Sequence, residues 1–173
     1  MLLAQISDLH LDGSDRARDR TSRVMDHLRS LPRPVDALLV TGDIADHAAE
    51  TLAWIDATLG ALPDGVPALI AFHQPPVELH HPLADATMLQ EPERLAALLD
   101  AHPRVVAVLT GHAHTAAAST FAGRPLIVGP AVTWTLRLPW EGDRPADRDQ
   151  PPGLAFHVLG EDRRLTTHFR VVL

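Results

Sequence analysis

The chain of 173 residues contains no cysteine, no lysine and no asparagine. The absence of cysteine excludes disulfide bonds, thiolate metal ligands and a cysteine nucleophile, and it agrees with a cytoplasmic location. The formal net charge of −7 argues against a general affinity for nucleic acid phosphates. No apolar run approaches the roughly 18 residues of a membrane span. We therefore expect neither a nucleic acid nor a membrane as a partner.

Apolar residues make up 46% of the chain and charged residues 21%, as in a globular protein that buries a sizeable core. The length favours a single domain over residues 1–173. The first six residues are apolar but lack a basic leader, and they indicate a strand rather than a signal peptide.

The hydrophobic pattern predicts strands and helices in alternation, followed by strands alone. We expect strands at residues 2–6, 36–41, 66–72 and 104–109, helices at 21–31, 47–59 and 92–101, and hairpins at 119–128 and 154–171. A polar, proline-rich loop covers residues 140–152. This order predicts an α/β fold.

Carboxylates and imidazoles follow four of the expected strands directly. They are Asp8, His10, Asp43, His73, His112 and His114. Because open α/β sheets place their sites at the carboxyl ends of the strands, we expect these side chains to converge on one edge. Carboxylate and imidazole ligands without thiolate suit manganese, iron or zinc.

Each fragment alone also has a structural interpretation. Asp8 and His10 lie two residues apart and can face one metal in extended backbone, or serve as a helix cap and a surface histidine. Asp43 can bridge two cations or belong to a turn after Gly42. Asp46 can orient a ligand or cap the helix that follows it.

The histidine fragments differ in how specific they are. A lone histidine such as His73, at the end of a buried strand, is more often structural than a ligand. His112 and His114 again lie two residues apart, and Gly-His-x-His after a valine-rich strand is the most specific fragment of the chain.

Taken together, these fragments resemble the calcineurin-like metallophosphoesterases, and within them the bacterial class III cyclic nucleotide phosphodiesterases. The resemblance extends over nearly the whole chain and is carried by residues 6–11, 41–46, 72–76 and 110–114. It implies an αββα sandwich of two sheets with helices outside. It also implies two metals, iron, manganese or zinc, and a hydroxide between them that attacks the phosphorus of a phosphodiester or an activated monoester.

The resemblance also implies a role for each candidate ligand. Asp8, His10, Asp43 and His114 would hold the first metal, and Asp43 would bridge to a second metal held also by His73 and His112. Asp43 and His112 are the residues expected to take part in catalysis.

One motif of the family is missing. A Gly-Asn-His-Asp or Gly-Asn-His-Glu segment normally supplies an asparagine ligand and a histidine that assists the transition state, and this chain has no asparagine. We therefore expect a sandwich truncated by the loss of an internal segment, a weaker second metal site and weakened hydrolysis.

Three other histidines are candidates for the missing role. His47, His80 or His81 can replace the absent histidine, or can be a helix-start residue and two solvated loop residues. The remaining candidates are expected to face solvent, namely His27, His102, His157 and His168.

Two further expectations follow from the missing segment. Its loss exposes a sheet edge, which favours a homodimer or higher oligomer. The alternative to an enzyme acting on a small phosphoester is a non-catalytic metal-binding domain that works by association.

Overall fold

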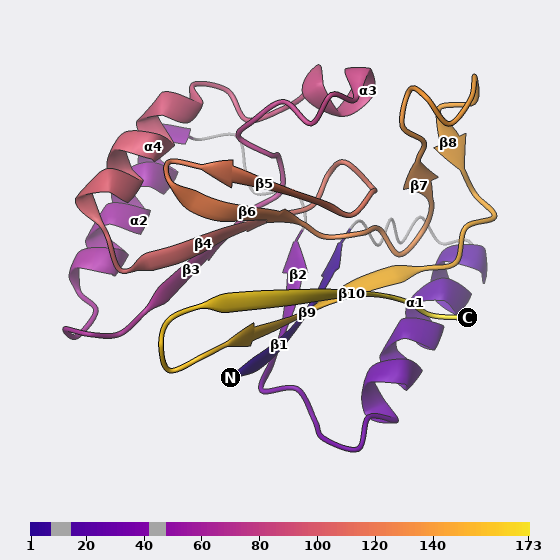
Figure 1. The fold of residues 1–173 in the computed structure, drawn as a ribbon, viewed down its shortest axis with the longest axis horizontal. Helices are drawn as coiled ribbons and strands as arrows, with labels where there is room; N and C mark the ends of the chain where they lie inside the picture. The colour runs from indigo at the N-terminus through magenta and orange to yellow at the C-terminus, as the bar shows by residue number, and fades with distance from the viewer. Residues whose placement is uncertain (8–14, 42–47) are drawn as a thin grey trace.

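In the computed structural model, two four-stranded sheets lie face to face, with helices on their outer surfaces (Figure 1). The structure describes residues 1–7, 15–41 and 48–173. The first sheet has the order β10-β9-β1-β2, with β1 at Leu2–Ser7, β2 at Ala37–Thr41, β9 at Gly153–Leu159 and β10 at Leu165–Val171. The second has the order β3-β4-β6-β5, with β3 at Ala68–Ala71, β4 at Val105–Thr110, β5 at Ala117–Phe121 and β6 at Arg124–Val128.

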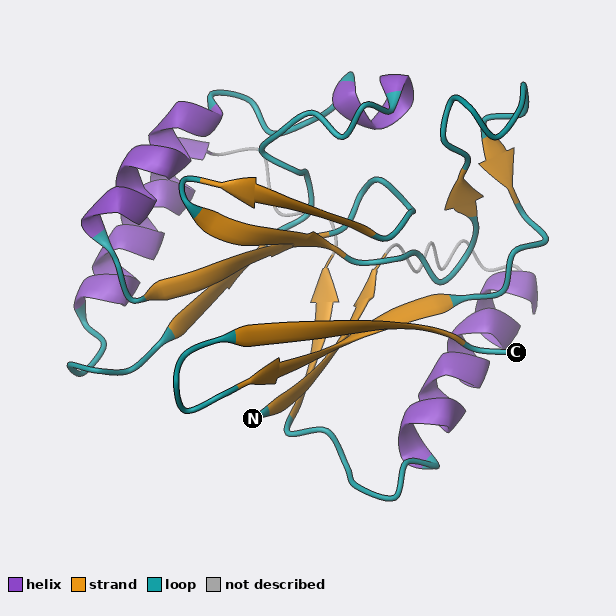
Figure 2. Cartoon of the chain, viewed as in Figure 1, coloured by secondary structure: helices purple, strands orange, loops and turns teal. Residues whose placement is uncertain are grey.

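Helices cover the outer face of each sheet, as Figure 2 shows. Helix α1 (Asp15–Arg29) lies against the first sheet, while α2 (Ala48–Gly60) and α4 (Pro92–Ala101) lie side by side against the second. Pairs of leucines or valines four residues apart make these contacts, because such residues share one face of a helix. In α1 the pair is Val24 and Leu28, and in α4 it is Leu95 and Leu99. The two-sheet α/β architecture expected from the sequence is therefore confirmed.

Parallel pairing directs the ends of several strands to one edge. β1 pairs in parallel with β2, and β4 pairs in parallel with both β3 and β6. Within each sheet the carboxyl ends of these strands therefore lie together, and His73, His112 and His114 follow the ends of β3 and β4.

Polar side chains lie between the two sheets. Alternate residues of β1 point to opposite sides, so that Ala4 and Ile6 join the core beneath α1 while Gln5 points toward the second sheet. The Gln5 amide donates to the carbonyl oxygen of Thr110 at 2.8 Å, and a Cβ at Gly129 would lie 2.8 Å from the same amide nitrogen. A side chain at residue 129 would therefore have to displace the Gln5 amide from this position.

His157 is one of these polar side chains, so the expectation that it faces solvent is wrong. Its side chain is fully buried between Gln5 and Thr167. Alternation along a hairpin does not reveal which of its two faces packs on a second sheet, and this explains the error.

Helix α1 begins at Asp15, six residues before the expected start. Its first turns are polar, and this hides them in the sequence. Arg20 is buried nevertheless, because its Nε donates to the Val132 carbonyl at 2.6 Å and its Nη2 to the Gln150 carbonyl at 2.7 Å. Contacts more than 100 residues away in sequence therefore hold the start of this helix.

Two loops contain short elements that the sequence did not predict. The histidine-rich loop forms α3 (Pro82–Asp85). Within the proline-rich loop lies β8 (Ala146–Asp147), which pairs with β7 (Thr135–Leu136), just before that loop. Among the described residues, no helix is long and apolar enough to cross a membrane.

Candidate metal site

Three of the six candidate ligands lie within the described residues: His73 after β3, and His112 and His114 after β4. Asp8, His10 and Asp43 lie outside the described residues, as do Asp46 and His47. The parallel pairing of β3 and β4 continues past the strand ends, because the Phe72 amide donates to the Leu109 carbonyl and the Gly111 amide to the His73 carbonyl, at 3.1 and 3.0 Å. These bonds bring the His73 and His112 loops together.

The imidazoles of His73 and His112 meet nitrogen to nitrogen. His73 Nε2 and His112 Nδ1 are 3.3 Å apart, and the ring planes are nearly perpendicular at 83°. Two nitrogen ligands at about 2.0–2.1 Å from one tetrahedral zinc ion would lie about 3.4 Å apart. The spacing therefore fits two ligands of one transition metal, and it also fits a direct hydrogen bond between the two rings.

The backbone at His112 and His114 is not in the extended conformation that the sequence analysis assumed for two residues that face one side. Both residues have positive φ, 68° for His112 and 53° for His114, and the Ala113 amide donates to the Gly111 carbonyl at 2.7 Å. The loop is tightly curled rather than extended. The extended-backbone argument for two side chains facing one side therefore does not apply to this pair.

His114 is fixed by Trp134. Its Nδ1 lies 2.9 Å from the Trp134 carbonyl oxygen, and the two rings are 3.8 Å apart at 33°. A carbonyl oxygen only accepts, so Nδ1 carries the proton and Nε2 carries the lone pair. A backbone carbonyl that orients a histidine in this way is typical of metal ligands.

The described part of the chain does not by itself assemble a complete site. Within residues 1–7, 15–41 and 48–173, no three histidine or carboxylate side chains gather closely enough to hold a metal ion. The pair of His73 and His112 is brought together there, and His114 is placed on the same loop. The joining of these residues to Asp8, His10 and Asp43 stays a prediction.

Two of the histidines considered as replacements have different surroundings. His80 is exposed and has a φ of 60°. His81 is buried rather than solvated, because its Nδ1 accepts from the Ala84 amide at the start of α3 and its Nε2 lies 2.8 Å from the Arg137 carbonyl. Both nitrogens of His81 are thus occupied by structural contacts.

The expectations for the remaining histidines are only partly correct. His168 is exposed as expected, and His27 is half-buried. The side chain of His102 is only 13% exposed, because its Nε2 contacts the Asp56 carboxylate at 2.7 Å across α2 and α4.

Thr87 is a site residue that the sequence analysis missed. Its Oγ1 lies 2.7 Å from His112 Nε2, on the side of the ring opposite His73. No sequence signal marks this contact, because it joins the loop after α3 to a loop 25 residues later.

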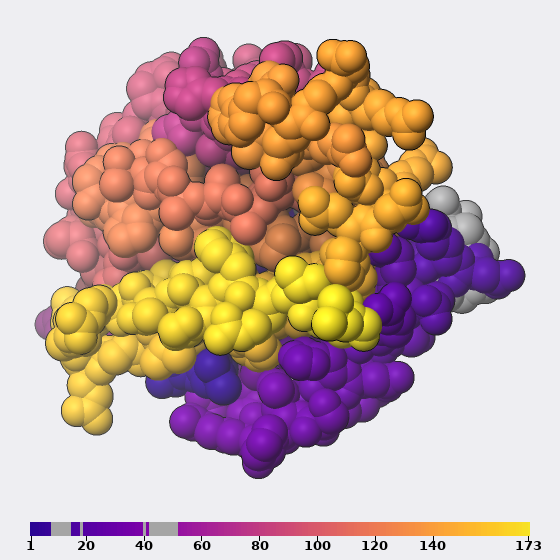
Figure 3. Space-filling model, turned by 45° about the vertical axis from the view of Figure 1, so that its right-hand side comes forward, coloured from indigo at the N-terminus to yellow at the C-terminus, as the bar shows by residue number. Residues whose placement is uncertain are grey.

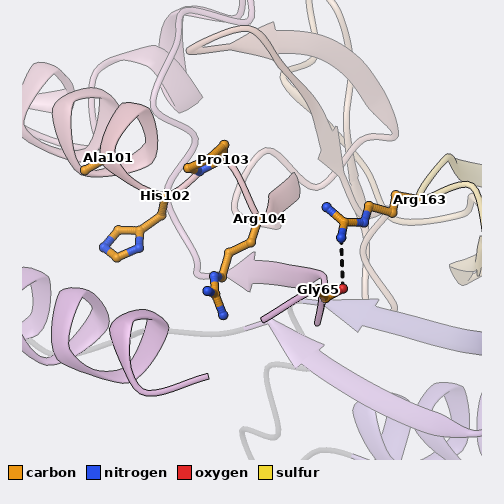
Figure 4. Close-up of a pocket in the computed structure, with 6 residues that line it drawn as sticks. All are labelled: Gly65, Ala101, His102, Pro103, Arg104 and Arg163. Carbon is orange, nitrogen blue, oxygen red and sulfur yellow. Dashed lines mark hydrogen bonds between the residues drawn. The ribbon is translucent and has the colours of Figure 1, made fainter. Parts of the chain in front are cut away.

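Two cavities lie at opposite ends of the strands. One, of about 220 Å³, is lined by His114 and by residues near the end of β10. The C-terminal segment that contains β10, in yellow, crosses the surface shown in Figure 3. The other, of about 240 Å³, lies where β3 and β4 begin (Figure 4). There Arg163 donates to the Gly65 carbonyl at 3.0 Å, and none of the candidate ligands lines it. The first cavity is therefore the one associated with the site.

Comparison with known proteins confirms the resemblance to a family. The family model described as calcineurin-like phosphoesterase matches residues 1–71. A 3',5'-cyclic-nucleotide phosphodiesterase from Nostoc sp. is 42% identical over 67 residues, which are 39% of this chain and 25% of the relative. A probable cyclic nucleotide phosphodiesterase from Rhodococcus erythropolis is 34% identical over 122 residues, 69% of this chain and 38% of the relative.

The fold is also found among solved structures. A dimetal phosphatase from Danio rerio superposes with a TM-score of 0.51 and 20% identity, over 92% of this chain and 49% of that one. This likeness concerns the fold. The matched part of the chain spans between a quarter and about half the length of these three proteins.

Proposed function

We propose that this chain hydrolyses phosphoesters, phosphodiesters above all, with the help of bound metal ions. The observation that carries the proposal is the pair of ring nitrogens, His73 Nε2 and His112 Nδ1, 3.3 Å apart beyond the ends of two parallel strands. The phosphodiesterase names of the sequence relatives support the choice of reaction.

The proposed ligand sets follow the family pattern. Asp8, His10, Asp43 and His114 hold one metal, and Asp43, His73 and His112 hold the other. Iron, manganese and zinc all suit such oxygen and nitrogen ligands. When bound, such ions generate a hydroxide nucleophile at neutral pH and neutralise charge on the phosphoryl oxygens. The second site is the weaker one, because no asparagine completes it.

The protein supplies orientation and a place for the substrate. The Trp134 carbonyl accepts from His114 Nδ1, and Nε2 is the His114 nitrogen proposed to bind the metal. The cavity beside His114 has Phe169 and Arg170 among its lining residues. A small organic group esterified to phosphate fits the chemistry of that lining. Asp43 and His112 remain the proposed catalytic residues, and the absence of cysteine supports a cytoplasmic enzyme.

Loss of the assisting histidine affects the choice of leaving group. General acid assistance is typically worth about 10²–10⁴-fold, and an aryl phosphodiester needs less of it because it releases a stabilised phenolate. We expect an aryl phosphodiester to turn over far faster than a nucleotide diester. His81 is already committed to the Arg137 carbonyl, so His47 and His80 are the histidines left to supply help.

The test is hydrolysis of bis(p-nitrophenyl) phosphate by the manganese-loaded chain. His112→Ala is expected to lower kcat/KM at least about 100-fold, as loss of a metal ligand should, whereas His168→Ala, which changes an exposed histidine of β10, should leave it unchanged. Metal-loaded protein that gives no hydrolysis would overturn the proposal and favour a metal-binding domain that acts by association.

A further inference from the structure

We propose that Thr87 is a positioning residue, which orients His112 as a metal ligand and fixes the position of its ring proton. This inference rests on the proposed function, because it concerns the same metal site. It adds a residue from outside the ligand fragments, on the far side of the His112 ring from the metal.

The contacts of the His112 ring carry the argument. Thr87 Oγ1 lies 2.7 Å from Nε2, while Nδ1 faces His73 Nε2 at 3.3 Å. The contact with the hydroxyl is the shorter of the two, and it fixes the plane of the ring. The same hydroxyl lies 3.4 Å from the Leu83 carbonyl oxygen.

Metal binding through His112 Nδ1 would determine whether the Thr87 hydroxyl donates to the ring or accepts from it. A histidine that binds a metal through Nδ1 is neutral and carries its proton on Nε2. That proton needs an acceptor, and Thr87 Oγ1 is in place to accept it. The hydroxyl then donates its own proton to the Leu83 carbonyl. The His112 Nε2–H and the Thr87 hydroxyl thus each have an acceptor.

The same hydroxyl also suits the metal-free arrangement. There His112 Nδ1 can donate to His73 Nε2, and Nε2 then accepts from the Thr87 hydroxyl. A threonine or serine hydroxyl serves both states, because it can donate or accept. A valine side chain of the same shape serves neither.

The segment that carries Thr87 is held in place on both sides. The Thr87 amide donates to the Ala84 carbonyl at 3.2 Å, and the Leu89 amide donates to the Pro75 carbonyl at 3.0 Å. The Asp85 carboxylate accepts from the Leu79 and His81 amides at 2.7 and 2.9 Å. Thr87 therefore presents its hydroxyl from a fixed platform rather than from a free loop.

The expected loss of metal affinity on substitution of Thr87 depends on how exposed this side chain is. Removing the partner that orients a metal-bound histidine typically costs about 10–100-fold in metal affinity. Thr87 is exposed, so water can replace part of the lost hydrogen bond. We therefore expect a loss near the lower end, about tenfold.

The experiment is calorimetric titration of the metal-free chain with manganese, comparing Thr87→Val with Thr87→Ser. Thr87→Val should weaken the weaker binding step about tenfold, and Thr87→Ser, which keeps the hydroxyl, should bind within about twofold of the unchanged chain. Thr166→Val is the matched control, because Thr166 is an exposed threonine of β10, and it should bind normally. Thermal unfolding of the metal-free forms should show a cooperative transition for all four proteins, so that a binding loss is not a loss of fold.

Three results are distinguishable. Normal binding by Thr87→Val, while the unchanged chain binds metal, overturns the role of Thr87 and leaves the proposed function standing. Equal losses in Thr87→Val and Thr87→Ser also overturn it, since the hydroxyl is then not the active group. Absence of metal binding by the unchanged chain overturns both proposals together.

Discussion

His157 is a histidine whose burial favours the neutral ring by lowering its pKa. The Gln5 amide nitrogen donates to Thr41 Oγ1 and to the Thr110 carbonyl, so Gln5 Oε1 is the acceptor that faces His157 Nε2 at 3.0 Å. His157 Nε2 therefore carries the ring proton, and Nδ1 accepts from the Thr167 hydroxyl at 2.9 Å. The ring thus links strands of the first sheet, and through Gln5 it is coupled to the end of β4.

Burial of His157 makes the stability of the fold depend on pH. Desolvation lowers the pKa of His157 from 6.5 to about 4. Between pH 6.5 and about pH 4 this histidine is therefore protonated in the unfolded chain and neutral in the folded chain. Stability is fully present above about pH 6.5 and is lost as the pH falls toward about 4, by up to about 3 kcal/mol. The check is urea unfolding at several pH values, with His157→Gln for comparison.

The comparison variant separates this group from the carboxylates that titrate in the same range. His157→Gln removes the titrating ring and should lose less stability on acidification than the unchanged chain. His168→Gln, at an exposed position of β10, should behave like the unchanged chain. Parallel pH profiles for the chain and His157→Gln would refute the assignment.

At the scale of single elements, β2 is one of the two edge strands of its sheet. Within the described residues it pairs with β1 alone, and Leu38 is 37% exposed although the strand was expected to be buried. β3 is likewise an edge of the second sheet. On α2, the Trp54 side chain is 67% exposed. Open edges and exposed large apolar side chains are features through which chains associate.

We therefore predict that the chain forms a homodimer or higher oligomer. Light scattering at micromolar concentration should give at least twice the mass of one chain. Leu38→Lys and Trp54→Lys should shift the mass toward the monomer, because each places a charge on an apolar contact. Trp140→Lys changes an equally exposed tryptophan in the loop between β7 and β8 and should have no effect. A monomeric chain would contradict the prediction.

At the scale of the whole molecule, the order of strands and helices could be predicted because their signals are local. Apolar runs marked the strands, and residues four apart such as Val24 and Leu28 marked the helix faces. The placement of His73 and His112 at one edge followed from parallel strands that end together. These features needed no knowledge of distant contacts.

The features that sequence reasoning missed depend on contacts between distant segments. Arg20 holds the start of α1 through carbonyls of residues 132 and 150, and Gln5 joins the two sheets through Thr110. The contact of Thr87 with His112 and the burial of His157 are of the same kind. Asp8, His10 and Asp43 lie outside the described residues, so their part in the site rests on the sequence.

The central claim, that this edge of the sandwich holds metal, is tested most directly by the metal content of the chain. Elemental analysis of protein purified without chelator should find at least one equivalent of manganese, iron or zinc per chain. Titration of the metal-free chain with manganese should then show two unequal steps, because the proposed second site has three protein ligands in place of four. Protein that contains no metal near stoichiometry, and takes up none when manganese is supplied, would contradict the account.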